Sequence, residues 1–362
     1  MILYILMALV TIVFAMMGVF SVSMNNEQLH TKVNIRNLKI CNAFGMGGLF
    51  FMFFLTACRA HSIGNDTETY VRYFNAIKEM GINHRYQIEL GYQYINLLIA
   101  KITKNENFFL VIISSIVYMG IGRYIYKYSK NVLISVCLFF CLFFSSFTSM
   151  VRQSLAMVIG LFAYQMLKEK RYVQFAILVV IAAFIHKSAL VLLLLLLYKW
   201  IPYRCKYIYG IAGVIAVLSA SGILNEILIM VLPEYQYYFS SVYASSGWLA
   251  VSFAVLRAFF LYWMAFDSCK ENLKESKLIL CVFGMLLLCC SFGYSVNLFV
   301  RASEYFLLIG IVEIPNMFYE RKVKNYRIKE IAVCSFLVCY FILVLIYRPE
   351  WNRIYPYNFW WN

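Results

Sequence analysis

Apolar stretches of about 14 to 22 residues recur along the whole chain and limit its possible folds more than any other feature. A bilayer has a hydrocarbon core about 30 Å thick and takes up helices of about 20 apolar residues. No soluble core could absorb a chain with 63% hydrophobic and 14% charged residues. Runs such as LVLLLLLLYKW lack the alternation of a membrane β-barrel. We therefore expect an all-α polytopic membrane protein with a single integral membrane domain over residues 1–362.

The apolar runs predict about twelve transmembrane helices, with roughly 10 to 12 as the range. The expected spans are 1–22, 40–60, 107–125, 131–150, 154–167, 172–185, 188–201, 207–225, 248–266, 278–296, 298–318 and 330–347. One long loop, 61–106, has the pattern of an amphipathic helix. The first span has its basic residues behind it and none in front, which favours a retained span with an outside N-terminus over a cleaved signal peptide.

Lysine and arginine set the predicted orientation, because short loops rich in these residues stay in the cytoplasm. With the N-terminus outside, inner loops hold 20 of the 32 basic residues, outer segments hold 11, and Arg257 lies inside a span. This distribution explains the net charge of +15, so we expect no nucleic acid as a partner. The loop 61–106 is then extracytoplasmic.

The segment 172–201 decides the orientation of everything after it, because it is either one long tilted helix or two short helices broken at His186. A single helix would put the last three basic loops outside, against the orientation rule. Two helices are therefore expected. Like 154–167, each would have about 14 residues and be about 21 Å long, and such short spans suggest a local dip or a water-filled cavity.

Ionisable residues at membrane depth are candidates for function, because placing them in hydrocarbon is costly. Arg152 interrupts one apolar run, and His186 with Lys187 interrupts the next. These residues and Arg301 are expected at the outer face. Arginine and lysine suit a phosphate or diphosphate, and histidine suits a general base. The alternatives are snorkelling of Arg301 and Lys187 to the interface, and a packed, hydrogen-bonded His186.

The outer loop adds carboxylates and tyrosines to this face. Asp66, Tyr70 and Phe74 are spaced at i, i+4 and i+8, which places them on one face of a helix, and Glu89 and Tyr92 follow. Such groups suit sugar hydroxyls and the flat faces of sugar rings. Asp66 is also a second candidate for the base. The alternatives are an amphipathic helix on the membrane surface and, for Asp66, a helix N-cap.

Several common chemistries find no support in the sequence. It contains no Walker loop, HExxH or GxSxG motif. Nine of the 11 cysteines lie in or at the ends of apolar spans. Cys137 and Cys141 share a helix face but have no CxxC or histidine partners, so we read them as packing residues. We expect neither a metal nor another cofactor.

The order of the motifs GNDTETYVRYF, ELGYQYIN, NFF, VRQSLA, AAFIHKSALV, RASEYF and YPYN resembles the EpsG branch of the Wzy-type O-antigen and exopolysaccharide polymerases. The resemblance covers nearly the whole chain, and RQ-x-LA followed by HKSAL is its more specific part. It implies a multipass glycosyltransferase, similar to the GT-C class, in the bacterial cytoplasmic membrane. The enzyme would act on undecaprenyl-diphosphate-linked sugars at the outer leaflet, without a metal.

Such a polymerase transfers a growing glycan from its lipid diphosphate to a hydroxyl of the next lipid-linked repeat unit. The expected roles are diphosphate binding by Arg152, Arg301 and Lys187, proton abstraction by His186 or Asp66, sugar contact by Glu89, Tyr70 and Tyr92, and further substrate binding by Gln153, Arg257 and Glu304. Expected partners are the donor and acceptor lipids, the bilayer and a chain-length regulator protein. A lipid-linked oligosaccharide flippase or other transporter, an O-antigen ligase and a membrane acyltransferase stay open as alternatives.

Overall fold

The computed structural model describes residues 32–83, 86, 88–200, 205–231, 248–269, 273, 276–296, 298–320, 326–351 and 353–361. Within these ranges the chain is almost entirely helical, which confirms the expected all-α class for them. The one pairing of extended backbone in the described ranges is an isolated antiparallel bridge between Arg59 and Phe359. The expected first span, 1–22, lies outside the described residues.

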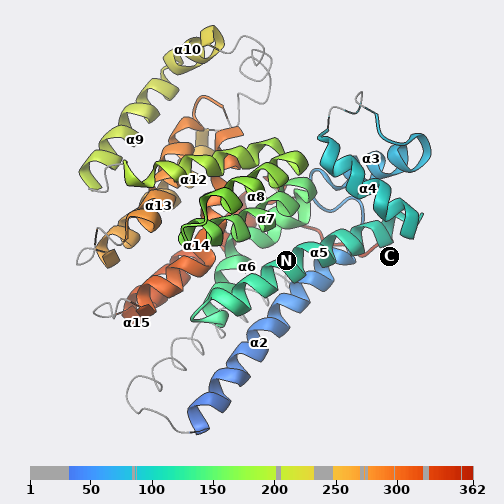
Figure 1. Ribbon diagram of the computed structural model, residues 1–362, viewed down its shortest axis with the longest axis horizontal. Coiled ribbons are helices and arrows are strands. Elements are labelled where there is room, and N and C mark those ends of the chain that lie inside the picture. The colour runs from blue at the N-terminus through green and yellow to red at the C-terminus, as the bar shows by residue number, and fades with distance from the viewer. Residues whose placement is uncertain are drawn as a thin grey trace.

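The described helices follow one another along the chain. They are α2 (Lys32–Ala57), α3 (Thr67–Met80), α4 (Leu90–Ile102), α5 (Glu106–Tyr128), α6 (Val132–Ser149), α7 (Val151–Lys168), α8 (Tyr172–Ile185), the 3₁₀-helix η2 (Lys187–Lys199), α9 (Cys205–Ala220), α10 (Ile223–Val231), α12 (Trp248–Cys269), α13 (Lys277–Phe292), α14 (Leu298–Glu320), α15 (Tyr326–Tyr347) and the short 3₁₀-helix η5 (Pro349–Trp351). Figure 1 shows α3 and α4 together at one side of the bundle, beside an end of α5.

Many of these helices have the length and composition of membrane spans. Among the described residues, five helices are long and apolar enough to cross a bilayer: Lys39–Ala57, Glu106–Tyr128, Val132–Ser149, Trp248–Cys269 and Ile328–Tyr347. Three more are shorter apolar helices: Tyr172–Ile185, Lys206–Ala220 and Lys277–Phe292. The chain is therefore a multi-pass membrane protein. One expected span is wrong in its extent: 207–225 is interrupted after Ala220, where Gly222 takes a φ of +81° before α10 begins.

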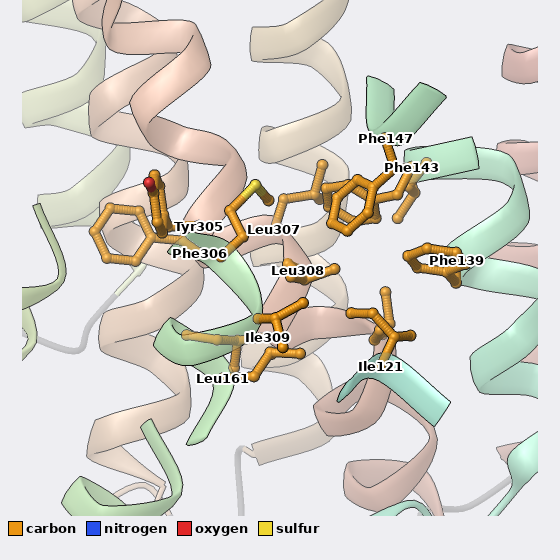
Figure 2. Close-up of a cluster of buried hydrophobic side chains, with 14 of the residues drawn as sticks. Ile121, Phe139, Phe143, Phe147, Leu161, Tyr305, Phe306, Leu307, Leu308 and Ile309 are labelled. Atoms are coloured by element: carbon orange, nitrogen blue, oxygen red, sulfur yellow. The ribbon is translucent and has the colours of Figure 1, made fainter. Parts of the chain in front are cut away.

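The helix α6 forms the centre of the bundle. In α6, 94% of the 18-residue apolar segment is buried inside the protein. In the corresponding segments of α2, α12 and α15 only 39 to 44% is buried, which leaves one side of each helix for lipid. The phenylalanines of α6 pack against the middle of α14 and against α5 and α7 (Figure 2). A helix that is apolar on all sides can lie in lipid or inside a protein core, and α6 lies inside the core. This central packing fixes the outer ends of α7 and α14 relative to each other.

Two helices, α8 and η2, form an antiparallel hairpin that reverses direction at His186. The first residue of α8 lies beside the end of η2, because the hydroxyls of Tyr172 and Tyr198 are 3.3 Å apart and the Lys199 ammonium lies 5.3 Å from the centre of the Tyr172 ring. A single long helix would separate these residues by its whole length. The predicted break at His186 is thus confirmed.

The second arm of this hairpin is wound differently from the expected α-helix. Residues 187–199 form a 3₁₀-helix, which rises about 2.0 Å per residue instead of about 1.5 Å, so η2 is about 26 Å long. Its buried side chains, Ala189, Leu192 and Leu195, recur every third residue, as this winding requires. Leu192 packs against Gly160 of α7, where a Cβ would come within 2.8 Å of it. The expectation of a span shortened to about 21 Å is therefore wrong for this segment.

The segment after α15 folds back onto the segment after α2. The amides of Ala60 and Gly64 donate to the carbonyls of Asn358 and Arg353, at 2.9 and 3.0 Å. The Tyr357 hydroxyl donates to the carbonyl of Leu55. The aromatic tail thus closes against the start of the outer loop. These contacts place the ends of α2 and α15 on the same face, as the predicted orientation requires.

Candidate functional site

Glu89 joins three segments that are far apart in the sequence. It occupies the N-cap position of α4, and its carboxylate accepts a hydrogen bond from a guanidinium nitrogen of Arg152, in the first turn of α7. The other carboxylate oxygen lies 3.2 Å from Nδ1 of His186 and accepts the Lys187 backbone N–H at 3.0 Å. We call Glu89, Arg152 and His186 the triad. The structure thus brings together three of the residues expected at the outer face.

Helix ends deliver each member of the triad. Residue His186 takes an extended conformation, with a φ of −153° and a ψ of 111°, directly after α8 and before η2. Arg152 is the second residue of α7. The expected span 154–167 would have placed it before the start of this helix. Helix N-termini expose unpaired N–H groups that favour anions. The N-terminus of α7 and the Arg152 guanidinium therefore attract an anion at the same place.

The charge state of Glu89 determines which nitrogen of His186 carries a proton. Burial alone would raise the pKa of Glu89, but the hydrogen bond with His186 and the charge of Arg152 outweigh it and lower the pKa to about 2. An ionised carboxylate only accepts hydrogen bonds, so Nδ1 must donate to it. In neutral His186 this leaves Nε2 with its lone pair, which is the arrangement of a general base.

Two tyrosines support the triad from the outer loop. The Arg152 guanidinium lies 5.9 Å from the centre of the Tyr70 ring, and the Tyr70 ring packs edge-on against Tyr92 at 5.7 Å. Burial raises the pKa of both phenols, so both stay neutral. The exposed fraction is 6% for Tyr70 and 0% for Tyr92. Both residues were expected to contact sugar, and the structure shows Tyr70 packed against Arg152 and Tyr92 packed against Tyr70.

The remaining outer-face residues lie around the triad at different depths. The Gln153 side chain is buried and donates to the backbone carbonyl of Arg301 at 2.7 Å, which ties α7 to the start of α14. The side chains of Arg301 and Lys187 are exposed. Asp66 takes the N-cap position of α3 but makes no capping bond with its side chain, and within the described residues it has no bond to the triad.

A second polar group lies between α12 and α14. Arg257 is 7% exposed, and Glu304 interacts electrostatically with it and with Arg301. One carboxylate oxygen of Glu304 and the Nε of Arg257 are buried without a hydrogen-bond partner among the described residues. No acidic residue is close to Arg257 in the sequence, and its acidic neighbour Glu304 lies on another helix, α14. Arg257 also lies over the ring of Tyr340 of α15, 5.5 Å from its centre.

Two residues that sequence reasoning did not single out connect these groups. Ser188 donates from its hydroxyl to that of Tyr305 at 3.3 Å, next to His186 on one side and Glu304 on the other. Tyr305 is 2% exposed. Both lie in motifs that carried the family resemblance, HKSAL and RASEYF. These motifs were the signal by which the sequence could have pointed to them. Within the described residues, no group of three histidine, cysteine or acidic side chains could hold a metal ion.

Gly91 lets α4 approach α8 closely enough for Glu89 to reach His186. A Cβ at this position would lie 2.5 Å from the backbone carbonyl oxygen of Phe184, which cannot move aside as a flexible side chain could. We expect Gly91→Ala to displace α4, to separate Glu89 from His186, and to lower activity about tenfold or more at normal membrane abundance. Gly47→Ala is the control, because a Cβ at this position would meet nothing within 4 Å. Equal activity of Gly91→Ala and the unmodified chain would contradict this role of the glycine.

The comparisons with known proteins agree with the motif order. The family model described as the EpsG family matches residues 43–359. No curated protein and no solved structure matches the chain.

Proposed function

The chain belongs to the EpsG family, whose polymerases are similar to Wzy, and we propose that it joins lipid-linked oligosaccharide repeat units into a polysaccharide. The donor is a growing glycan on undecaprenyl diphosphate, and the acceptor is the next lipid-linked repeat unit at the outer leaflet. The family match supports a membrane protein of the polysaccharide polymerase type. The observation that supports the chemistry is the triad, in which one partly buried carboxylate contacts both a histidine and an arginine at helix ends.

The proposed reaction uses the two sides of the triad for two tasks. Nε2 of His186 takes the proton of the acceptor hydroxyl as its oxygen forms the new bond to the anomeric carbon. The bond between that carbon and the diphosphate oxygen breaks, and the electron pair leaves with the diphosphate. Arg152, with the N-terminus of α7, stabilises this negative charge. Glu89 orients His186 and stabilises the imidazolium that forms.

The other candidates have supporting roles in this proposal. Arg301 and Lys187 are exposed at the same face and attract the diphosphates. Asp66 lies outside the triad, so we assign the base to His186 and leave Asp66 to bind sugar hydroxyls. The buried tyrosines hold Arg152 in place. Arginine and lysine provide all the positive charge, so the proposed enzyme is metal-independent.

We further propose the bacterial cytoplasmic membrane as the location, a GT-C-like arrangement of about 12 spans, and a site that faces the outside. A chain-length regulator protein is a proposed partner. The orientation rests on the inner basic loops and on the contacts that place the ends of α2 and α15 on one face.

This orientation predicts the labelling of single cysteines in a background free of the 11 native cysteines. Lys104→Cys, in the outer loop, is expected to react with an impermeant maleimide added to intact cells. Lys206→Cys, at the start of α9, is expected to react only after the cells are opened. Both lysines are exposed, so burial does not hide either cysteine. Labelling of Lys206→Cys in intact cells would overturn the proposed orientation.

The proposed function is tested by deleting the gene and separating the surface polysaccharide on a gel. Loss of a polymerase should reduce a ladder of long chains to a single repeat unit. Complementation with the unmodified chain should restore the ladder. A surface without any repeat unit would instead favour a flippase or a ligase.

A further inference from the structure

An apolar groove of about 390 Å³ opens between α12 and α15 near the outer face. Its walls include Leu249 and Phe253 of α12 with Tyr340, Val344 and Tyr347 of α15. Arg348 and Trp351, which follow the C-terminus of α15, line one end of the groove. The start of α12 lies beside the end of α13, because the Ser252 hydroxyl is 2.8 Å from the hydroxyl of Tyr294. In the proposed orientation these helix ends are at the outer face.

Three features distinguish this groove from an ordinary lipid-facing surface. It is hollowed between two membrane helices, where a flexible apolar chain is removed from both water and bulk lipid. One end of the groove has a cation at the height of lipid headgroups: Arg348 is 45% exposed, and its contact with Glu350, at 3.6 Å, is an exposed pair that contributes little. The lining of the groove includes Tyr340, whose ring centre is 5.5 Å from the Arg257 guanidinium, and Arg257 interacts electrostatically with Glu304.

We propose that this groove binds the polyprenyl chain of one lipid-linked substrate, with Arg348 binding its diphosphate. The proposal rests on the proposed function, since a polymerase must hold two lipid-linked substrates at one face. The triad provides one binding site for a diphosphate, at the start of α7 and the end of α8. The groove provides a second entry from the membrane, at the ends of α12 and α15, and leads along Tyr340 toward Arg257 and Glu304. The volume of the groove is within the usual range for small-molecule sites.

The binding test uses the purified full-length chain and undecaprenyl diphosphate, followed by native mass spectrometry. Val344→Trp fills the groove and is expected to weaken binding about tenfold or more. Ile346→Trp is the matched control, because Ile346 lies on the same helix, is 48% exposed and does not line the groove. Arg348→Ala is expected to weaken binding of undecaprenyl diphosphate and leave binding of undecaprenol unchanged. Equal binding by Val344→Trp and Ile346→Trp would overturn the proposal.

A competition experiment tests whether the groove is specific. Phosphatidylglycerol in about hundredfold excess is expected to leave the bound undecaprenyl diphosphate in place. Displacement of undecaprenyl diphosphate at this excess would mean that the groove binds ordinary membrane lipids, and the proposal would be wrong.

The gel assay separates failure of this proposal from failure of the proposed function. If Val344→Trp binds and polymerises like the unmodified chain, the groove assignment fails and the polymerase assignment stands. If the unmodified chain binds undecaprenyl diphosphate through Val344 but gene deletion leaves chain length unchanged, the lipid site stands and the polymerase assignment fails.

Discussion

Arg152→Ala is expected to abolish polymerisation while the protein accumulates normally in the membrane. Truncating one partner of a buried charge pair costs about 2 to 5 kcal/mol, which corresponds to a loss of roughly thirty- to several-thousand-fold. Here the loss has two sources: the diphosphate loses its guanidinium, and Glu89 loses a partner that helps keep it ionised. The measurement is polysaccharide chain length on a gel, alongside a quantitative immunoblot of the membrane fraction.

Arg152→Lys separates these two sources. Lysine keeps the positive charge beside Glu89 but lacks the planar fork that binds two phosphate oxygens at once. We expect a stable protein with at most a short, weak ladder. Arg72→Ala is the control, since Arg72 is an exposed arginine of the outer loop that donates to the Thr69 hydroxyl and has no contact with the triad among the described residues. A full ladder from well-expressed Arg152→Ala would remove Arg152 from the site.

His186→Ala is expected to lower the rate of glycan transfer about 10²- to 10⁴-fold, the usual contribution of a general base. The rate is measured in membrane vesicles supplied with purified lipid-linked repeat unit. Because the His186 side chain is 20% exposed, added imidazole should restore part of the rate. A purely structural histidine would not be replaced in this way.

The control for this experiment is His61→Ala. His61 also lies at the outer face and beside a carboxylate, 3.5 Å from Glu106, but it is not part of the triad. We expect its removal to leave the rate within about twofold. If His186→Ala retains the full rate, the base must be sought elsewhere, and Asp66 is the first alternative.

The membrane helices could be predicted closely from sequence because apolar length alone determines them. The expected span 172–185 coincides with α8, and 131–150 differs from α6 by one residue at each end. The winding of η2 could not be predicted in this way, since a run of leucines is compatible with an ordinary α-helix. What distinguishes the 3₁₀ form is tertiary packing: the buried residues recur every third position, and Leu192 packs on Gly160.

The candidate residues were identifiable, but their partners were not. Arg152 and His186 were recognisable because ionisable groups interrupt apolar runs. Their shared partner Glu89 lies 63 and 97 residues away from them along the chain, and no local periodicity encodes such a contact. The same holds for Arg257, whose acid is on α14. From the sequence Glu89 was therefore assigned to sugar contact, and the structure adds its contacts with Arg152 and His186.

The winding of η2 sets the distance from His186 to the other end of this helix. A 3₁₀-helix turns about 120° per residue and an α-helix about 100°, so six residues from Ala189 to Leu195 would rotate Leu195 by about 120° on conversion. The same 13 residues would shorten by about 6 Å. The packing of Leu192 against Gly160 of α7 holds this winding in place. A residue inserted into η2 would therefore change the distance from His186 to the other end of η2 without changing any residue of the triad.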